Sequence, residues 1–277
     1  MLRRVGRFRV VPVLMLLPFA VGEGGPAPAD ADANAFRVCA DPNNLPFSDS
    51  TGGGFENRIA ALIAEDLHMP LRYTWFPQRR GFVRNTLRAG LCDVVMGVPT
   101  SYELTASTDA YYRSTYVFVT RADRHLDIRS FDDTALRHLR IGVHMMGDDY
   151  ANSPAVLSLM RRGLGGQVVG YMIYGDYSRP HPPSALVEGV ERGDVDVAVV
   201  WGPLAGYFAR KSRTPLTITP VSPIIDLPFT PYVFDIGLGL RRGDSTRRAA
   251  LNFELARRKT DIRRILDEYA VPTLAAP

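Results

Sequence analysis

Apolar residues recur along the chain with two different spacings. Short runs rich in β-branched residues predict strands, whereas apolar residues three and four positions apart predict amphipathic helices. In the first half these segments follow one another as strand 36–40, helix 55–67, strand 71–76, helix 81–89 and strand 92–98. The same order returns downstream as strand 139–143, helix 153–162, strand 168–173, helix 184–191 and strand 195–200. This alternation predicts α/β units whose parallel sheets are covered by helices on both faces.

Two stretches, 87–95 and 190–198, carry the same local pattern 103 positions apart. Each reads as the end of a helix, a glycine, two residues, an aspartate and a strand. A repeat of this length is too long for a solenoid and predicts two similar doubly wound lobes.

Two further strand-like segments, 111–120 and 232–240, are expected to carry the chain from the first lobe to the second and back. A last helical stretch, 246–269, would then pack on the first lobe. The predicted first lobe comprises 34–120 plus 235–277, and the second comprises 121–234.

The first 33 residues read as a signal peptide. Four arginines precede an apolar run at 10–21, and small residues follow it. Twelve residues would rise about 18 Å as a helix, which is well short of a hydrocarbon core of roughly 30 Å. The chain is therefore expected to be exported and to have no permanent membrane anchor.

The composition is typical of a globular protein, and no part of the sequence carries a long run of charge of one sign. Of 277 residues, 46% are hydrophobic and 22% are charged, with a net charge of +4. No stretch carries five or six like charges, so neither nucleic acid nor an anionic membrane is an expected partner.

The two cysteines, Cys39 and Cys92, are the only possible pair. Export to an oxidising compartment permits a disulfide between them. Two buried thiols acting as small apolar side chains are the alternative, and the sequence does not decide between the two.

Signatures of catalysis are absent. The glycines at 237–243 have the wrong spacing for a dinucleotide fingerprint, and the chain contains no GxxxxGK[ST], GxSxG or HExxH motif. The five histidines show no ligand spacing, and the acid pairs at 148–149 and 194–196 are explained by helix capping and strand entry. We therefore expect no enzyme activity, no metal and no cofactor.

Loops that follow the carboxyl ends of parallel strands line the crevice of open α/β sheets. For the asparagines and prolines of 41–46, a purely structural use in turns is the alternative. The predicted cleft residues are Asp41, Asn43, Asn44, Pro46, Phe47, Pro99, His144, Met145, Tyr174 and Trp201.

A basic cluster lies between a predicted strand and the helix that follows it. Guanidinium groups there could grip carboxylates of a partner or an anion, although an ordinary solvated helix start is the alternative. An aromatic pair and an arginine at the first crossing could form a shelf or hinge, or simply pack. The predicted contact residues are Gln78, Arg79, Arg80, Arg84, Tyr111, Tyr112 and Arg113.

Several of these segments resemble the exported, two-lobed substrate-binding proteins of ABC importers with type II topology. The matching pieces are GFENRIAALIAEDL at 54–67, the Gly-x-x-Asp element that ends at Met96-Gly97, Tyr111-Tyr112, Ile141-Gly142-Val143, and GLGLRRGD at 237–244. The resemblance implies the type II periplasmic binding protein fold, with two lobes joined by two crossover strands.

Three longer runs resemble the periplasmic J proteins encoded beside quinoprotein methanol dehydrogenases, the MxaJ/XoxJ family. They are FRVCADPNNLPFS at 36–48, PQRRGFVRNTLRAGLCDVVMGVP at 77–99 and YYRSTYVFVTR at 111–121. The resemblance implies a periplasmic protein that assists or matures a dehydrogenase whose own cofactor is pyrroloquinoline quinone with calcium or a lanthanide. The basic cluster would then contact the dehydrogenase or its tricarboxylate cofactor.

The chain departs from amino-acid-binding relatives at all three elements that hold a zwitterion. The segment between Gly97 and Tyr111 contains no arginine, and the acids at 148–149 would cap the second-lobe helix and repel an anion. Trp201-Gly202-Pro203 replaces the acid that would pair with an ammonium group. An amino acid would lose its charged partners in the cleft. The alternative function is therefore substrate binding for an ABC importer of some other small molecule.

Overall fold

The computed structural model describes residues 34–145, 153–172 and 177–275. The predicted signal peptide and the acid pair at 148–149 lie outside the described residues. No helix in the described part of the chain is long and apolar enough to cross a membrane.

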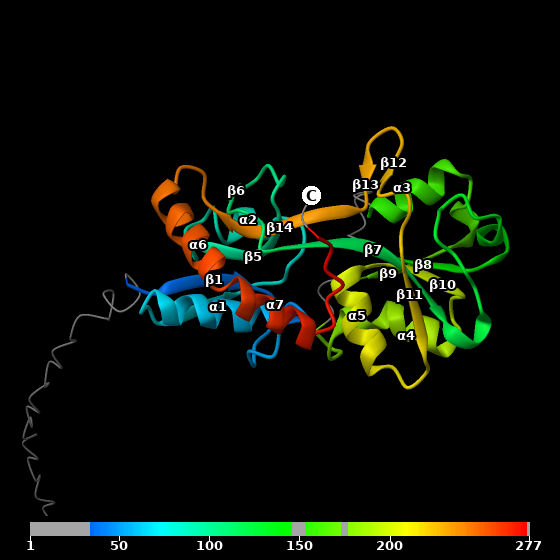
Figure 1. The fold of residues 1–277 in the computed structure, drawn as a ribbon, viewed down its shortest axis with the longest axis horizontal. Coiled ribbons are helices and arrows are strands. Elements are labelled where there is room, and N and C mark those ends of the chain that lie inside the picture. Colours follow the sequence, from blue (N-terminus) through cyan, green and yellow to red (C-terminus); the bar gives the residue numbers. More distant parts are fainter. Residues whose placement is uncertain (1–33, 146–152, 173–176, 276–277) are drawn as a thin grey trace, which may run out of the picture.

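Two α/β lobes are joined by a pair of long antiparallel strands (Figure 1). The strands are β1 Phe36–Ala40, β4 Leu71–Trp75, β5 Val94–Pro99, β6 Ala106–Ser107, β7 Tyr112–Arg121, β8 Ile141–Met145, β9 Val168–Met172, β10 Val197–Trp201, β11 Leu216–Pro220 and β14 Val233–Leu240. Two small hairpins add β2 Asn43–Asn44 with β3 Ser48–Asp49, and β12 Ile225–Asp226 with β13 Thr230–Pro231. The helices are α1 Phe55–Asp66, α2 Phe82–Asn85, α3 Pro154–Arg161, α4 Ala185–Arg192, α5 Gly202–Lys211, α6 Ser245–Arg257 and α7 Lys259–Glu268.

One sheet runs through the whole molecule in the order β4-β1-β5-β14-β7-β10-β8-β9. β1 pairs in parallel with β4 and β5 in lobe 1, and β8 pairs in parallel with β9 and β10 in lobe 2. β7 and β14 pair with each other in antiparallel fashion and form the two connections. The predicted two lobes with two crossover strands are confirmed, whereas their boundaries stay a prediction.

Helices cover each half of the sheet. In lobe 1, α1, α6 and α7 bury a core with the apolar side chains of β1, β5 and β14. In lobe 2, α3 packs on one face of the sheet, and α4 with α5 packs on the other. Behind the crossover strands, Tyr207 of α5 stacks on Tyr269 after α7 with ring centroids 5.6 Å apart. The two lobes therefore also touch away from their connecting strands.

One predicted helix was wrong in extent, and a second helical stretch is divided. The helix expected at 81–89 is the single turn α2, because the Thr86 hydroxyl donates to the Phe82 carbonyl and the following chain forms wider turns. The basic cluster at 79–84 therefore does not lie at the start of a long helix. The stretch predicted to be helical at 246–269 is helical, and it consists of two helices, α6 and α7, with a break at Arg258.

Candidate functional site

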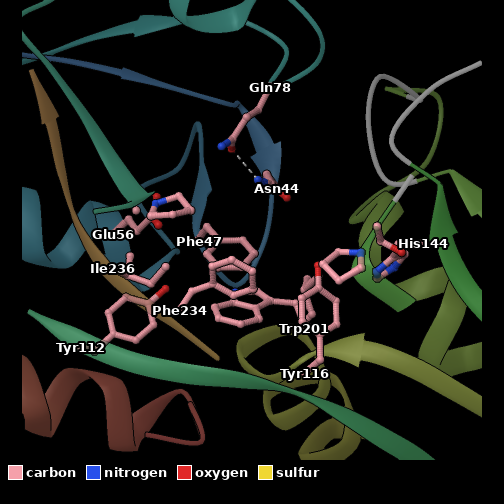
Figure 2. A pocket seen from close by; sticks show the side chains of 15 residues that line it. Asn44, Phe47, Glu56, Gln78, Tyr112, Tyr116, His144, Trp201, Phe234 and Ile236 are labelled. Atoms are coloured by element: carbon pink, nitrogen blue, oxygen red, sulfur yellow. Dashed lines mark hydrogen bonds between the residues drawn. The ribbon is translucent and has the colours of Figure 1, made fainter. Parts of the chain in front are cut away.

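A pocket of about 340 Å³ lies between the lobes (Figure 2). Both lobes and both crossover strands contribute side chains, most of them apolar or aromatic. The lining residues are Asn44, Phe47, Glu56, Gln78, Gly97, Pro99, Tyr112, Tyr116, His144, Ser153, Pro154, Trp201, Leu204, Phe234 and Ile236. This volume is within the range of small-molecule sites.

An aromatic wall forms the side of the pocket nearest the crossover strands (Figure 2). Trp201 ends β10 and lies opposite Tyr116 of β7 in the antiparallel pair, with ring centroids 5.4 Å apart. Phe234 of β14 stands edge-on to Trp201 at 5.8 Å. Cross-strand pairing of three large rings makes this wall rigid and apolar.

Glu56 places a buried carboxyl group in the lobe 1 part of the pocket. It belongs to the first turn of α1, and a side chain in place of Gly97 would bring its Cβ to 1.9 Å from Glu56 Oε1. Gly97 also has a φ of 65°, so both space and backbone conformation require glycine there. Burial raises the pKa of Glu56 to about 8. The carboxyl group is therefore mostly protonated at neutral pH and can donate a hydrogen bond.

His144 provides the matching neutral group in lobe 2. It lies in β8 and is buried, and burial lowers its pKa to about 4. Together Glu56 and His144 leave the described pocket without formal charge between about pH 4 and pH 8. An ionic ligand would be desolvated there without an opposite charge to pair with.

Several polar atoms of the pocket residues lack a hydrogen-bond partner among the described residues. They include Asn44 Oδ1, His144 Nε2 and Ser153 Oγ, all buried. The Asn44 amide is oriented by donating to Gln78 Oε1 at 2.9 Å. Buried polar atoms are normally satisfied, so these groups are suited to hydrogen bonds with a bound molecule.

A basic cavity adjoins this pocket in lobe 1. It measures about 650 Å³ and shares Gln78, Gly97 and Pro99 with the pocket. Its rim carries the arginines at 79, 80, 84 and 88, and its floor is apolar, with Phe82 and Val98 among the lining residues. Such a surface suits a partner with carboxylates around an apolar centre.

The structure brings together many, but not all, of the predicted site residues. Those on the pocket are Asn44, Phe47, Pro99, His144, Trp201, Gln78 and Tyr112, and those on the basic cavity are Gln78, Arg79, Arg80, Arg84 and Pro99. Asp41, Asn43, Pro46, Met145, Tyr111 and Arg113 lie elsewhere, and Tyr174 lies outside the described residues.

The predicted residues that do not line the pocket serve the surrounding structure. Arg113 pairs with Asp235 across the two crossover strands at 3.1 Å. Pro46 accepts a bond from the Phe55 amide at the start of α1, and Met145 packs beside Gly170 of the neighbouring strand. The ring of Tyr111 meets that of Tyr112 edge-on, 5.0 Å apart, behind the pocket.

Asp41 and Asn43 connect the lobes in front of the pocket. Asn43 donates to the Arg179 carbonyl at 2.9 Å and accepts from the His181 amide at 3.0 Å, while the Tyr177 hydroxyl donates to Asp41 Oδ1 at 3.2 Å. This interlobe latch holds residues 177–181 of lobe 2 against the loop after β1. Opening of the lobes would break all three bonds.

Replacing Asn43 by alanine should loosen this latch. We expect the His181 amide, which loses its acceptor, to exchange its hydrogen about tenfold faster in the variant, as the loss of one hydrogen bond predicts. Hydrogen exchange of the folded protein measures this rate. The exposed Asn85, replaced by alanine, is the control and should leave the rate unchanged. Equal rates in wild type and Asn43→Ala would show that the latch is not closed in solution.

Residues that sequence reasoning missed complete the pocket. Glu56 reads in the sequence as an ordinary acid in the first turn of a helix, which the helix dipole favours. Tyr116, Phe234 and Ile236 stand on strands that were predicted. Pro154 starts α3 next to the undescribed 146–152. A prediction that the two crossover strands pair with each other would have placed Tyr116 and Phe234 together.

Cys39 and Cys92 are joined by a disulfide in the structure, with their Cα atoms 5.5 Å apart. Both are buried, in the apolar cluster that also holds Phe82, Val95 and Val98. This cluster underlies the basic cavity. Among the described residues there is no group of three His, Cys, Asp or Glu side chains that could hold a metal.

Known proteins of similar sequence cover almost the whole chain, although no protein-family model matches it. Protein MoxJ of Methylorubrum extorquens AM1 is 32% identical over 259 residues, which is 89% of this chain and 84% of that protein. The chain belongs to the MoxJ family. A second MoxJ, from Paracoccus denitrificans, is 29% identical to this MoxJ-family protein over 263 residues, covering 90% and 92% of the two chains.

The crystal structure of the periplasmic binding protein XoxJ from Methylobacterium extorquens AM1 superimposes on this MoxJ-family protein with a TM-score of 0.72 at 34% identity. The match covers 87% of this chain and all of XoxJ. The expected periplasmic binding protein fold and the resemblance to the MxaJ/XoxJ family are both confirmed.

Proposed function

We propose that this protein is a non-catalytic periplasmic protein that assists or matures a pyrroloquinoline-quinone-dependent methanol or alcohol dehydrogenase by binding it. The observation that carries the proposal is its relation to MoxJ over 89% of the chain. The dehydrogenase holds the cofactor, and the present chain needs none.

Two features of the site support binding of a partner protein over amino-acid transport. The described pocket has no arginine and no ionised carboxylate with which to hold a zwitterion. The basic cavity beside it places the arginines at 79, 80 and 84 around an apolar floor. That arrangement resembles the centre and rim of a protein interface.

Titration with a purified quinoprotein dehydrogenase tests the proposal. We expect saturable binding, and a dissociation constant raised about tenfold or more when Arg79, Arg80 and Arg84 are all changed to glutamate, because rim charges steer association with an acidic surface. The loss should be larger at low salt than at high salt. Calorimetry at two salt concentrations measures both effects.

A second triple variant controls for the change in net charge. Arg137, Arg248 and Arg263 are exposed and far from the cavity in sequence, and their reversal to glutamate alters the charge by the same amount. This variant should bind almost as the wild type does. If both triple variants lost affinity equally, the basic cavity would not be the contact, and if the wild type did not bind at all, the proposed function would be wrong.

The second candidate is a substrate-binding protein of an ABC importer for an uncharged small molecule. The pocket of about 340 Å³, with its apolar walls and unpartnered polar atoms, favours it. Affinity capture of the tagged protein from periplasmic extract separates the two. A permease, or a small molecule released when the protein is denatured, supports transport, whereas the dehydrogenase supports assistance.

A further inference from the structure

An apolar hairpin projects from lobe 2 next to the start of β14, along the upper edge of the molecule in Figure 1. It comprises residues 224–231, with β12 and β13 as its two arms. At its tip Leu227 is 81% exposed and Phe229 is 89% exposed. Ile224 and Ile225 on the first arm are 59% and 52% exposed. A cluster of large apolar side chains in water marks a surface that another molecule covers.

The base of the hairpin is held firmly even though its tip is bare. Asp226, buried between the arms, accepts bonds from Arg161 at 2.7 Å and from Arg162 at 2.8 and 3.0 Å. The Tyr232 hydroxyl is 3.3 Å from the same carboxylate, and Arg161 also donates to Thr230 at 2.9 Å. These hydrogen bonds hold the pKa of Asp226 well below its usual range.

The anchoring of the hairpin base fixes the position of the exposed side chains at its tip. The ion pairs of Asp226 tie the first arm to the end of α3, and the hydrogen bond from Arg161 to Thr230 ties the second. Leu227 and Phe229 are therefore presented in one arrangement. A partner that binds them does not have to order the hairpin first.

The composition of the hairpin indicates which kind of molecule covers it. No lysine or arginine occurs between 221 and 232. The hairpin therefore lacks the basic residues that attract an apolar, membrane-inserting segment to anionic lipid. Four apolar side chains bury a few hundred Å², well below the roughly 1,200 Å² of a stable symmetric pair. The hairpin therefore suits a local insertion into an apolar groove of a partner protein.

The position of the hairpin agrees with that of the basic cavity. In the view of Figure 1, α2, which carries Arg84 of the cavity, and the hairpin both lie above the long strand β7. One large partner can span both. Hairpin and cavity would then supply, respectively, an apolar anchor and the charged contacts of one interface.

We propose that Leu227 and Phe229 insert into an apolar groove on the dehydrogenase, an inference that rests on the proposed function. The test is calorimetric titration of the dehydrogenase with the wild-type protein and the Leu227→Ser/Phe229→Ser variant. Because both side chains are exposed, the variant should keep the wild-type melting temperature. Loss of two apolar anchors should raise its dissociation constant at least about tenfold.

A matched variant replaces exposed apolar residues elsewhere. Leu91 is 50% exposed and Phe253 is 67% exposed, and the Leu91→Ser/Phe253→Ser variant should bind within about twofold of wild type. If the hairpin variant binds as tightly as wild type, the hairpin is not a contact, although the proposed function stands. If the wild type does not bind the dehydrogenase, the proposed function is wrong, and so is the assignment of the dehydrogenase as the hairpin's partner.

Two further measurements test whether a membrane or a second copy of the chain covers the hairpin instead. Flotation with anionic phosphatidylglycerol vesicles and sedimentation over a range of protein concentrations should show neither lipid binding nor self-association. Hairpin-dependent binding to vesicles, or a hairpin-dependent dimer, would overturn the assignment to the dehydrogenase.

Discussion

Raising the pH from 4 to 8 should favour the Glu56→Gln variant over the wild-type protein. The free energy of unfolding of the variant minus that of the wild type should increase by about 4 kcal/mol over this range. Burial raises the pKa of Glu56 to about 8, from 4.5 for an exposed glutamate. As pH rises, the unfolded chain releases this proton near pH 4.5, whereas the folded protein keeps it until about pH 8. The unfolded state thus binds fewer protons in this window, so the wild-type free energy of unfolding falls as pH rises.

Two opposing effects act on the Glu56 carboxyl group, and the cost of desolvation is larger than the effect of the helix dipole. Glu56 stands in the first turn of α1, where the helix dipole favours a carboxylate by about 0.3–1 kcal/mol. Burial of an unpaired charge costs several kcal/mol, and no basic side chain in the described part of the chain pairs with Glu56. Desolvation is therefore the larger effect.

Urea unfolding of both proteins between pH 4 and pH 8 measures this difference. His144 acts in the opposite direction: its pKa of about 4 means that the unfolded state binds more protons below pH 6.5, so stability is lost as pH falls toward 4. That loss is common to both proteins and cancels in the difference. The exposed Glu65 of the same helix, changed to glutamine, should follow the wild-type profile. Parallel profiles for Glu56→Gln and wild type would contradict a protonated Glu56.

Local patterns were enough to predict the two lobes, because each repeated motif contains a turn whose backbone conformation requires glycine. Gly90 and Gly193 have φ angles of 78° and 77° and end the two equivalent turns. Asp93 then binds Arg37 and two other arginines, and Asp196 accepts the Arg140 amide. The glycine that the left-handed backbone requires is a local signal, which a single sequence displays. The partners of the two aspartates are distant in the sequence, and only the fold brings them together.

The pocket and the hairpin could be predicted only in part, because their properties come from residues distant in the sequence. The protonation of Glu56 depends on burial against Gly97 of another strand. α5 was missed because Gly202 and Pro203 resemble a loop, although proline also starts helices. The apolar residues at 224–229 carry no periodicity, and only the ion pairs of Asp226 show that they form an anchored hairpin.

Replacing Cys39 and Cys92 together by alanine should lower the free energy of unfolding by roughly 4 kcal/mol, the chain-entropy value for a closed loop of this length. The two cysteines are 53 positions apart. For a protein of this size that loss corresponds to a melting temperature lower by about 10 °C. Alanine is chosen because both sites are buried, and a serine hydroxyl would add the cost of an unsatisfied polar group.

Calorimetric melting of the variant and of the wild type measures the shift, with the wild type repeated in dithiothreitol after unfolding and refolding. Reduced wild type and the double variant should melt at similar temperatures, whereas the folded, oxidised protein should resist the reductant because Cys39 and Cys92 are 1% and 0% exposed. The disulfide packs with Phe82, Val95 and Val98 beneath the arginine-lined cavity. A shift below about 2 °C would show that packing in this cluster, and not the covalent link, holds β1 and the chain that enters β5 together.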